Sequence, residues 1–98
     1  MLHDSIQETF DMSGEKEISK LRKEIDQIDK DLLQLVNQRA KCAVQIGLIK
    51  KKEGMPVFVP EREKQVIEQL VGMNEGPLAD DTIEELYQWL FIQMKNLE

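Results

Sequence analysis

A row of apolar residues along the first half of the chain is interrupted by an arginine where another apolar side chain is expected. The row advances by alternating steps of three and four, through Ile18, Leu21, Ile25, Ile28, Leu32 and Leu35. Arg39 takes the next position in step. This spacing is typical of one face of a long helix. A guanidinium in such a row is costly unless an anion meets it, so Arg39 is a candidate for anion binding.

A lysine further along the same segment shares the face of Arg39. Lys50 follows Arg39 by 11 residues, which is about three helical turns with a mismatch of roughly 20°. The two side chains therefore lie about 16 Å apart along the axis and can converge on a small ligand. Arg22 precedes Arg39 by 17 residues, about 25 Å along the axis and roughly a quarter turn away. Arg22 can reach the same ligand only from a second copy of the chain.

Two carboxylates occupy inward positions in the segments that follow. Glu63 starts an apolar stripe that continues three, four and seven residues later, and Glu98 lies four residues after Met94 on another stripe. Considered one at a time, each of these charged residues could have a structural role and not bind a ligand. Arg39 can form a buried ion pair with Glu63 or extend to water, and the remaining charges can line a solvated face.

Prolines and glycines divide the chain into three helical segments that must position these charges. Residues 1–13 are expected to be an N-terminal tail, and residues 14–98 the single domain. Ser13 is expected to cap a helix that runs to about Lys52, before a break at residues 53–56. A second helix is expected from about Pro60 to Gly72. A third is expected to be capped by Asp80 or Asp81 and to carry apolar residues as far as Leu97.

The predicted fold is all-α, with one long helix and two shorter ones. Two short helices cannot bury the apolar row of the long one, so we expect an intertwined helical homodimer. The net charge is −6, from 13 basic and 19 acidic residues, which argues against a nucleic-acid partner. With one cysteine and one histidine, no metal site is expected. The sequence shows neither a signal-peptide pattern nor an apolar stretch of about 18 residues, so a cytoplasmic protein without membrane contact is expected.

Several short motifs combine in an order that resembles the all-helical, AroQ class of chorismate mutases. They are Leu21-Arg22-Lys23-Glu24-Ile25-Asp26, Asp29, Leu32, Leu33, Arg39, Lys50, Pro56-Val57 and Pro60-Glu61-Arg62-Glu63. The resemblance covers about residues 16–98. It implies the Claisen-type rearrangement of chorismate, a small dicarboxylate, to prephenate on the way to phenylalanine and tyrosine. That reaction involves no covalent intermediate and no cofactor; it needs a folded substrate conformer and cations near the breaking ether bond.

The resemblance also implies a role for each charged residue. Arg39 and Arg22 of a second copy would bind the two carboxylates, and arginine suits this because its planar fork binds carboxylates bidentately. Lys50 would contact the ether oxygen, Glu63 would accept from the ring hydroxyl, and Arg62 would support the carboxylate side.

Three positions depart from the commonest family pattern. Glu98 stands where many members have a glutamine that donates to the ether oxygen, and a carboxyl group donates only when protonated. Activity is therefore expected to be higher at acidic pH. Met94 stands where a serine is common. Val59 stands where an acidic residue is common, so that only its backbone can bind substrate.

Two other functions remain open at this point. Isochorismate pyruvate lyase has the same fold, but the lyase pattern places an apolar residue directly after Pro-Glu-Arg. Here that residue is Glu63, which favours the mutase. The second alternative is a non-catalytic helical dimerisation module that keeps only the scaffold.

Overall fold

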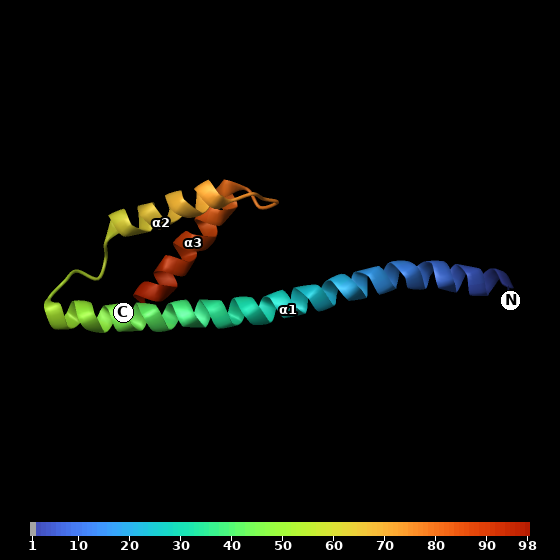
Figure 1. Cartoon of the computed structure of the whole chain (residues 1–98), viewed down its shortest axis with the longest axis horizontal. Helices are drawn as coiled ribbons and strands as arrows, with labels where there is room; N and C mark the ends of the chain where they lie inside the picture. Colours follow the sequence, from blue (N-terminus) through green and yellow to red (C-terminus); the bar gives the residue numbers. More distant parts are fainter. Residues whose placement is uncertain (1) are drawn as a thin grey trace. The chain divides into compact units, whose positions relative to one another are not determined.

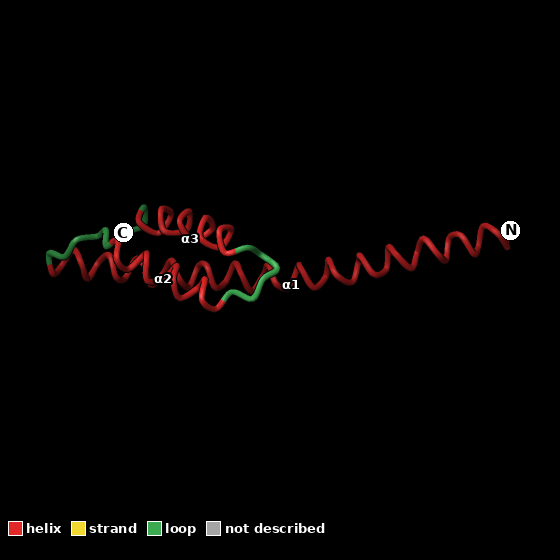
Figure 2. The backbone as a smooth tube through the Cα atoms, turned by 90° about the horizontal axis from the view of Figure 1, so that it is seen from above, coloured by secondary structure: helices red, strands yellow, loops and turns green. Residues whose placement is uncertain are grey.

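Three helices make up the described part of the chain. The computed structural model describes the backbone of residues 2–98 and the side chains of residues 13–98. The helices are α1 (Leu2–Glu53), α2 (Pro60–Met73) and α3 (Asp80–Lys95) (Figure 1). Residues 2–98 contain no strand (Figure 2). The prediction of an all-α fold with one long helix and two shorter ones is confirmed.

Helix α1 begins much earlier than the sequence indicated. It starts at Leu2, so Ser13 lies inside the helix and does not cap it. No proline precedes Pro56, and once a helix is nucleated, each further residue is added at little cost. The side chains of residues 1–12 lie outside the described residues. The assignment of residues 1–13 as a tail beyond the domain stays a prediction.

The chain divides into two compact units, residues 1–37 and residues 38–98. The first unit contributes only the N-terminal part of α1. Each residue of its apolar row has 50–58% of its surface exposed. The row consists of Ile18, Leu21, Ile25, Ile28, Leu32 and Leu35. The row is regular, but within this chain it is left largely uncovered.

The ends of the helices in the second unit follow from local backbone chemistry. Gly54 has φ +68°, and the Met55 amide donates to the Lys50 carbonyl at 2.8 Å, an arrangement that commonly ends a helix. Pro60 opens α2 as expected, because proline lacks the amide hydrogen that the first turn cannot use. The expected cap of α3 is wrong. Ala79 is the N-cap residue and makes no side-chain cap hydrogen bond.

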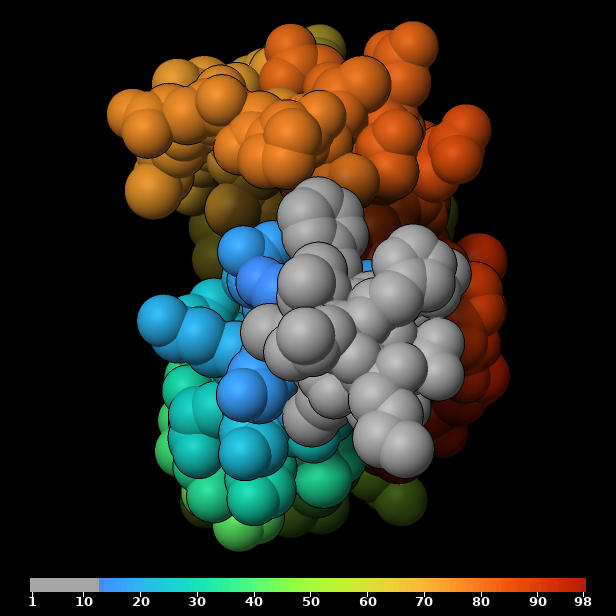
Figure 3. Space-filling view, turned by 90° about the vertical axis from the view of Figure 1, so that its right-hand side faces the viewer, coloured from blue at the N-terminus to red at the C-terminus, as the bar shows by residue number. Residues whose placement is uncertain are grey.

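Helices α2 and α3 pack as a hairpin, and Asn74 organises the turn between them. Its Nδ2 donates to the Leu78 carbonyl and to Asp80 Oδ1, both at 2.8 Å, and its Oδ1 accepts from the Gly76 amide at 3.1 Å. Asp80 thus receives a hydrogen bond from the turn in place of its expected capping role. The turn lies at the surface, in the orange region of Figure 3.

The buried core of the second unit is small. Among the described side chains, only three apolar ones are buried, each about 6% exposed: Ala43 of α1, and Phe91 and Met94 of α3. All three belong to the second unit, in which residues 38–53 of α1 and helix α3 carry them. No helix in residues 2–98 combines the length and the apolarity that crossing a bilayer requires.

We expect Asn74→Ala to lower the free energy of unfolding by about 1–2 kcal/mol, because three hydrogen bonds of the turn lose their partner. Urea unfolding followed by circular dichroism measures the change. Gln88→Ala is the matched control, since Gln88 makes a single long side-chain contact of 3.4 Å to Glu84 on an exposed helix face. Equal stability of the two variants would contradict this role for Asn74.

Candidate functional site

One cavity of about 440 Å³ lies within residues 38–98. Its wall combines an apolar lining with charged ends of side chains. The apolar part includes Ala43, Ile46, Val57, Val59, Val66, Phe91 and Met94, and the charged part is Arg39, Lys50, Arg62, Lys95, Glu63 and Glu98. The volume lies in the range of about 300–1,000 Å³ that is typical of small-molecule sites.

The charge of the cavity is opposite to that of the chain. Four cations and two carboxylates line it, which leaves an excess of two positive charges, whereas the whole chain carries −6. Because apolar walls weaken solvent screening, such a local excess attracts anions. The arrangement suits a small ligand with two negative charges.

Arg39 lies over an aromatic ring and does not form the ion pair that the structural alternative predicted. Its guanidinium carbon is 5.6 Å from the centroid of the buried Phe91 ring, a cation–π distance. Tyr87 supports that ring edge to face, with centroids 6.2 Å apart. Glu63 pairs instead with Lys95, at 2.9 Å between Nζ and Oε2. The alternative of an Arg39–Glu63 ion pair is therefore wrong. The Arg39 side chain is available to a ligand.

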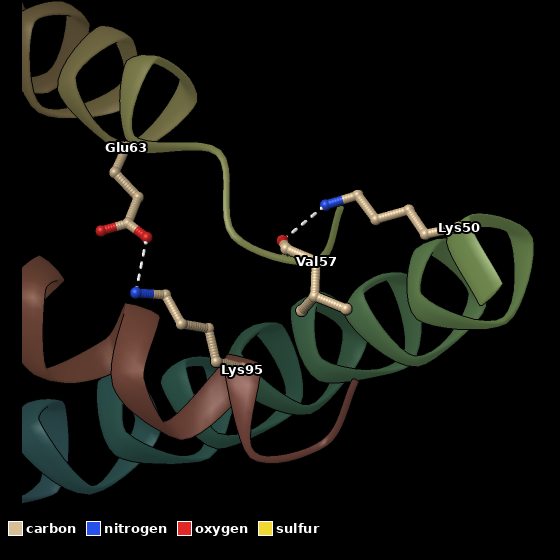
Figure 4. Close-up of polar contacts among 4 residues, drawn as sticks. All are labelled: Lys50, Val57, Glu63 and Lys95. Carbon is tan, nitrogen blue, oxygen red and sulfur yellow. Dashed lines mark hydrogen bonds and ion pairs between the residues drawn. The ribbon is translucent and has the colours of Figure 1, made fainter. Parts of the chain in front are cut away.

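Lys50 reaches from the end of α1 to the loop before α2. Its Nζ donates to the Val57 carbonyl at 2.9 Å (Figure 4). An ammonium group has three donors, so this contact fixes Nζ beside the cavity and leaves further donor capacity. The spacing argument that placed Lys50 and Arg39 on one face of the helix is consistent with both lining the cavity.

The start of α2 brings three further candidate residues to the cavity. The carbonyl of Val59 accepts from the amides of Arg62 and Glu63, at 3.1 and 3.4 Å, and so holds the first turn of the helix. The Arg62 side chain is exposed, and its Nη1 donates to Gln65 Oε1 at 2.8 Å. The Glu63 side chain is 28% exposed. All three residues line the cavity.

Glu98, which lines the cavity, lies very close to Gly47 of α1. A Cβ atom at position 47 would lie 3.0 Å from both Cα and Cβ of Glu98. These distances are tighter than ordinary Cβ contacts, so glycine at position 47 gives Glu98 the room to lie this close to α1. Met94, a further candidate, is buried and contributes to the apolar wall.

Two residues differ from the set of site residues predicted from the sequence: Arg22 does not line the cavity of this chain, and Lys95 does. Arg22 belongs to the unit formed by residues 1–37, where it is exposed, and every residue that lines the cavity comes from residues 38–98. Lys95 lines the cavity but was not among the predicted site residues. The available signal was its position four residues after Phe91, on the flank of the α3 apolar stripe. Within the described residues, no three metal-binding side chains cluster together.

Comparisons with known proteins agree on one family. The family model described as Chorismate mutase type II matches residues 21–98. A chorismate mutase of Methanocaldococcus jannaschii is 30% identical over 84 residues, which covers 85% of each protein. A bifunctional chorismate mutase/prephenate dehydratase of Aquifex aeolicus is 38% identical over 87 residues, which covers 85% of this chain but only 24% of that protein. The chain therefore spans about a quarter of the length of such bifunctional relatives.

The solved structures point the same way. The chorismate mutase (form II) from Thermus thermophilus superposes with a TM-score of 0.80 at 32% sequence identity. The match covers 82% of this chain and 91% of that one.

We expect Gly47→Ala to loosen the turn at residues 96–98 without unfolding α1. Alanine favours a helix interior by about 0.5–1 kcal/mol over glycine, but its Cβ would require Glu98 to shift by a few tenths of an ångström. Hydrogen–deuterium exchange at the Leu97 and Glu98 amides, which donate to the Met94 and Lys95 carbonyls, should quicken. Gly72→Ala is the control, since nothing lies within 4 Å of a Cβ there. Unchanged exchange in the Gly47 variant would refute the close approach.

Proposed function

The chain belongs to the type II chorismate mutase family, and we propose that it rearranges chorismate to prephenate in the biosynthesis of phenylalanine and tyrosine. The observation that carries the proposal is the cavity of residues 38–98, with its excess of two positive charges between apolar walls. Chorismate is a dicarboxylate, so its charge complements that excess. The rearrangement requires a folded conformer and stabilisation of charge that grows on the ether oxygen, and a cationic cavity of this size suits both requirements.

Arg39 and Lys50 act from α1. Arg39 binds a substrate carboxylate, and its position over the Phe91 ring limits the motion of the guanidinium before substrate arrives. Lys50 donates to the ether oxygen of the breaking bond. Its contact with the Val57 carbonyl holds Nζ in place, so little reorganisation is needed as negative charge develops.

The remaining site residues orient the substrate ring and its second carboxylate. Glu63 accepts a hydrogen bond from the ring hydroxyl, and Arg62 supports the carboxylate side. The backbone of Val59 and the side chain of Met94 complete the contacts, at positions where the family more often has polar side chains. Glu98 donates to the ether oxygen in its protonated form.

We further propose that two copies of the chain intertwine as a homodimer in the cytoplasm. The exposed apolar row of α1 supports the dimer, since six side chains with half or more of their surface in water are costly in a folded protein. A second copy covers that row and supplies Arg22 to the cavity. This arrangement satisfies the distance argument, which excluded Arg22 and Arg39 of one helix from meeting the same ligand.

The first test of the proposed function is turnover of chorismate, with the product identified. The wild-type protein should form prephenate, and Arg39→Ala should lower kcat/KM by at least about 100-fold, because the guanidinium that binds a substrate carboxylate is lost. Lys41→Ala, on the same helix but outside the cavity lining, is the control. Pyruvate release from isochorismate would favour the lyase, and a folded dimer inactive on both compounds would favour a dimerisation module.

The composite site is tested by mixing two inactive variants, Arg22→Ala and Arg39→Ala. After joint unfolding and refolding, half of the dimers are mixed, and one of the two sites in each mixed dimer has both arginines. Activity should therefore return to about a quarter of the wild-type value. If both arginines of a site came from the same chain, no mixture would restore activity.

The role of Glu98 is tested by the dependence of kcat/KM on pH. Because only the protonated carboxyl donates, activity should rise as the pH falls. In Glu98→Gln the amide donates at every pH, so the profile should flatten and activity at neutral pH should increase. A wild-type profile that is flat or rises toward alkaline pH would argue against Glu98 as the donor.

A further inference from the structure

We infer that Lys95 is a positioning residue of this site, which holds the Glu63 carboxylate and the Phe58 loop so that Glu63 meets the substrate hydroxyl. The inference rests on the proposed function. It concerns a residue that neither touches the reacting atoms nor was predicted from the sequence. Three observations support it: the ion pair, the ring contact and the pattern of partners around the cavity.

The Lys95–Glu63 pair differs from an ordinary surface ion pair. Nζ lies 2.9 Å from Oε2, and the two side chains are only 34% and 28% exposed. The surface pair Lys64–Glu68 has a distance of 4.0 Å and exposures of 79% and 66%. Partly buried pairs are screened less by water and salt, so the Lys95 contact constrains Glu63 more strongly.

The pair leaves Glu63 able to accept a further hydrogen bond. The ion pair joins Lys95 Nζ to Oε2, and the other oxygen of the carboxylate lies to the side of that contact (Figure 4). A carboxylate has about four acceptor positions on its two oxygens, so one ion pair does not saturate it. Lys95 thereby fixes the direction in which the second oxygen is presented.

Lys95 also holds the loop that joins α1 to α2. Its Nζ lies 3.9 Å from the centroid of the Phe58 ring, well within cation–π range. The neighbouring residue Val57 accepts a hydrogen bond from Lys50, so the loop is held from α1 by one lysine and from α3 by the other. Because Glu63 lies in the first turn of α2, directly after this loop, loop and carboxylate are positioned together.

Among the four cations of the cavity, Lys95 alone is partnered by a carboxylate of the cavity. The groups that contact the other three are an aromatic ring at Arg39, a carbonyl at Lys50 and an amide oxygen at Arg62. These neutral partners leave a cation free to meet an anion. The charge of Lys95 is already matched by Glu63, which is why it acts through Glu63 and not on the substrate.

A double-mutant cycle on kcat/KM for chorismate tests this role. Lys95→Met should lower kcat/KM by about 10-fold in the wild-type background, but by less than about 2-fold in Glu63→Gln, where the carboxylate to be positioned is gone. Lys95→Arg, which retains the charge, should stay within about 3-fold of wild type. Lys64→Met is the matched control, since it removes one exposed lysine from the same helix as Glu63 and should change kcat/KM by less than about 2-fold.

The outcomes separate this inference from the proposed function. A wild-type protein that does not convert chorismate contradicts the proposed function, and the positioning role falls with it. With an active wild type, equal losses from Lys95→Met in both backgrounds would mean that Lys95 acts directly on substrate or on folding, which overturns the inference. Circular dichroism and dimer mass check folding. If Lys95→Met does not fold, Lys95→Gln takes its place in the cycle with the same expected coupling.

Discussion

Four cations line one small cavity and repel one another. Each of them contacts a group of residues 38–98 that fixes its position, and these contacts shape the site. Three of the four cations are held by neutral groups: a ring for Arg39, a backbone carbonyl for Lys50 and an amide for Arg62. Such partners restrain the direction of a side chain without cancelling its charge. The cavity therefore keeps a positive excess in an acidic chain, and the proposed dianionic substrate completes its charge balance.

Neighbouring residues near the end of α3 make different contacts with the cavity. Met94 is buried and closes the apolar wall, whereas the next residue, Lys95, turns toward α2 and its preceding loop. A third residue near the end of this segment, Glu98, approaches α1 over the bare backbone of Gly47. One short stretch thus contributes an apolar surface, a positioning charge and the proposed hydrogen-bond donor. Met94 and Lys95 differ in direction because successive helical positions point about 100° apart.

Under the proposed dimer, the binding site and the assembly depend on each other. The second unit buries few side chains, and the apolar row of the first unit is half exposed or more. A protein of this size gains little stability from such a core alone. Under the proposed dimer, the surface that stabilises the fold also carries Arg22 to the cavity. Folding and substrate binding would then both require the same contacts between the two copies.

The sequence alone determined the three helices, the boundaries near Gly54 and Pro60, and the candidate status of Arg39, Lys50, Glu63 and Glu98. These follow from the 3.6-residue period and from backbone limits on glycine and proline, which are local properties. Sequence reasoning missed the start of α1 at Leu2, since nothing local distinguished it from a tail. Only the tertiary structure decided that Glu63 pairs with Lys95 and not with Arg39. Ion partners on different helices are chosen by distances of a few ångströms, and those depend on how the helices pack, which no spacing along the chain specifies.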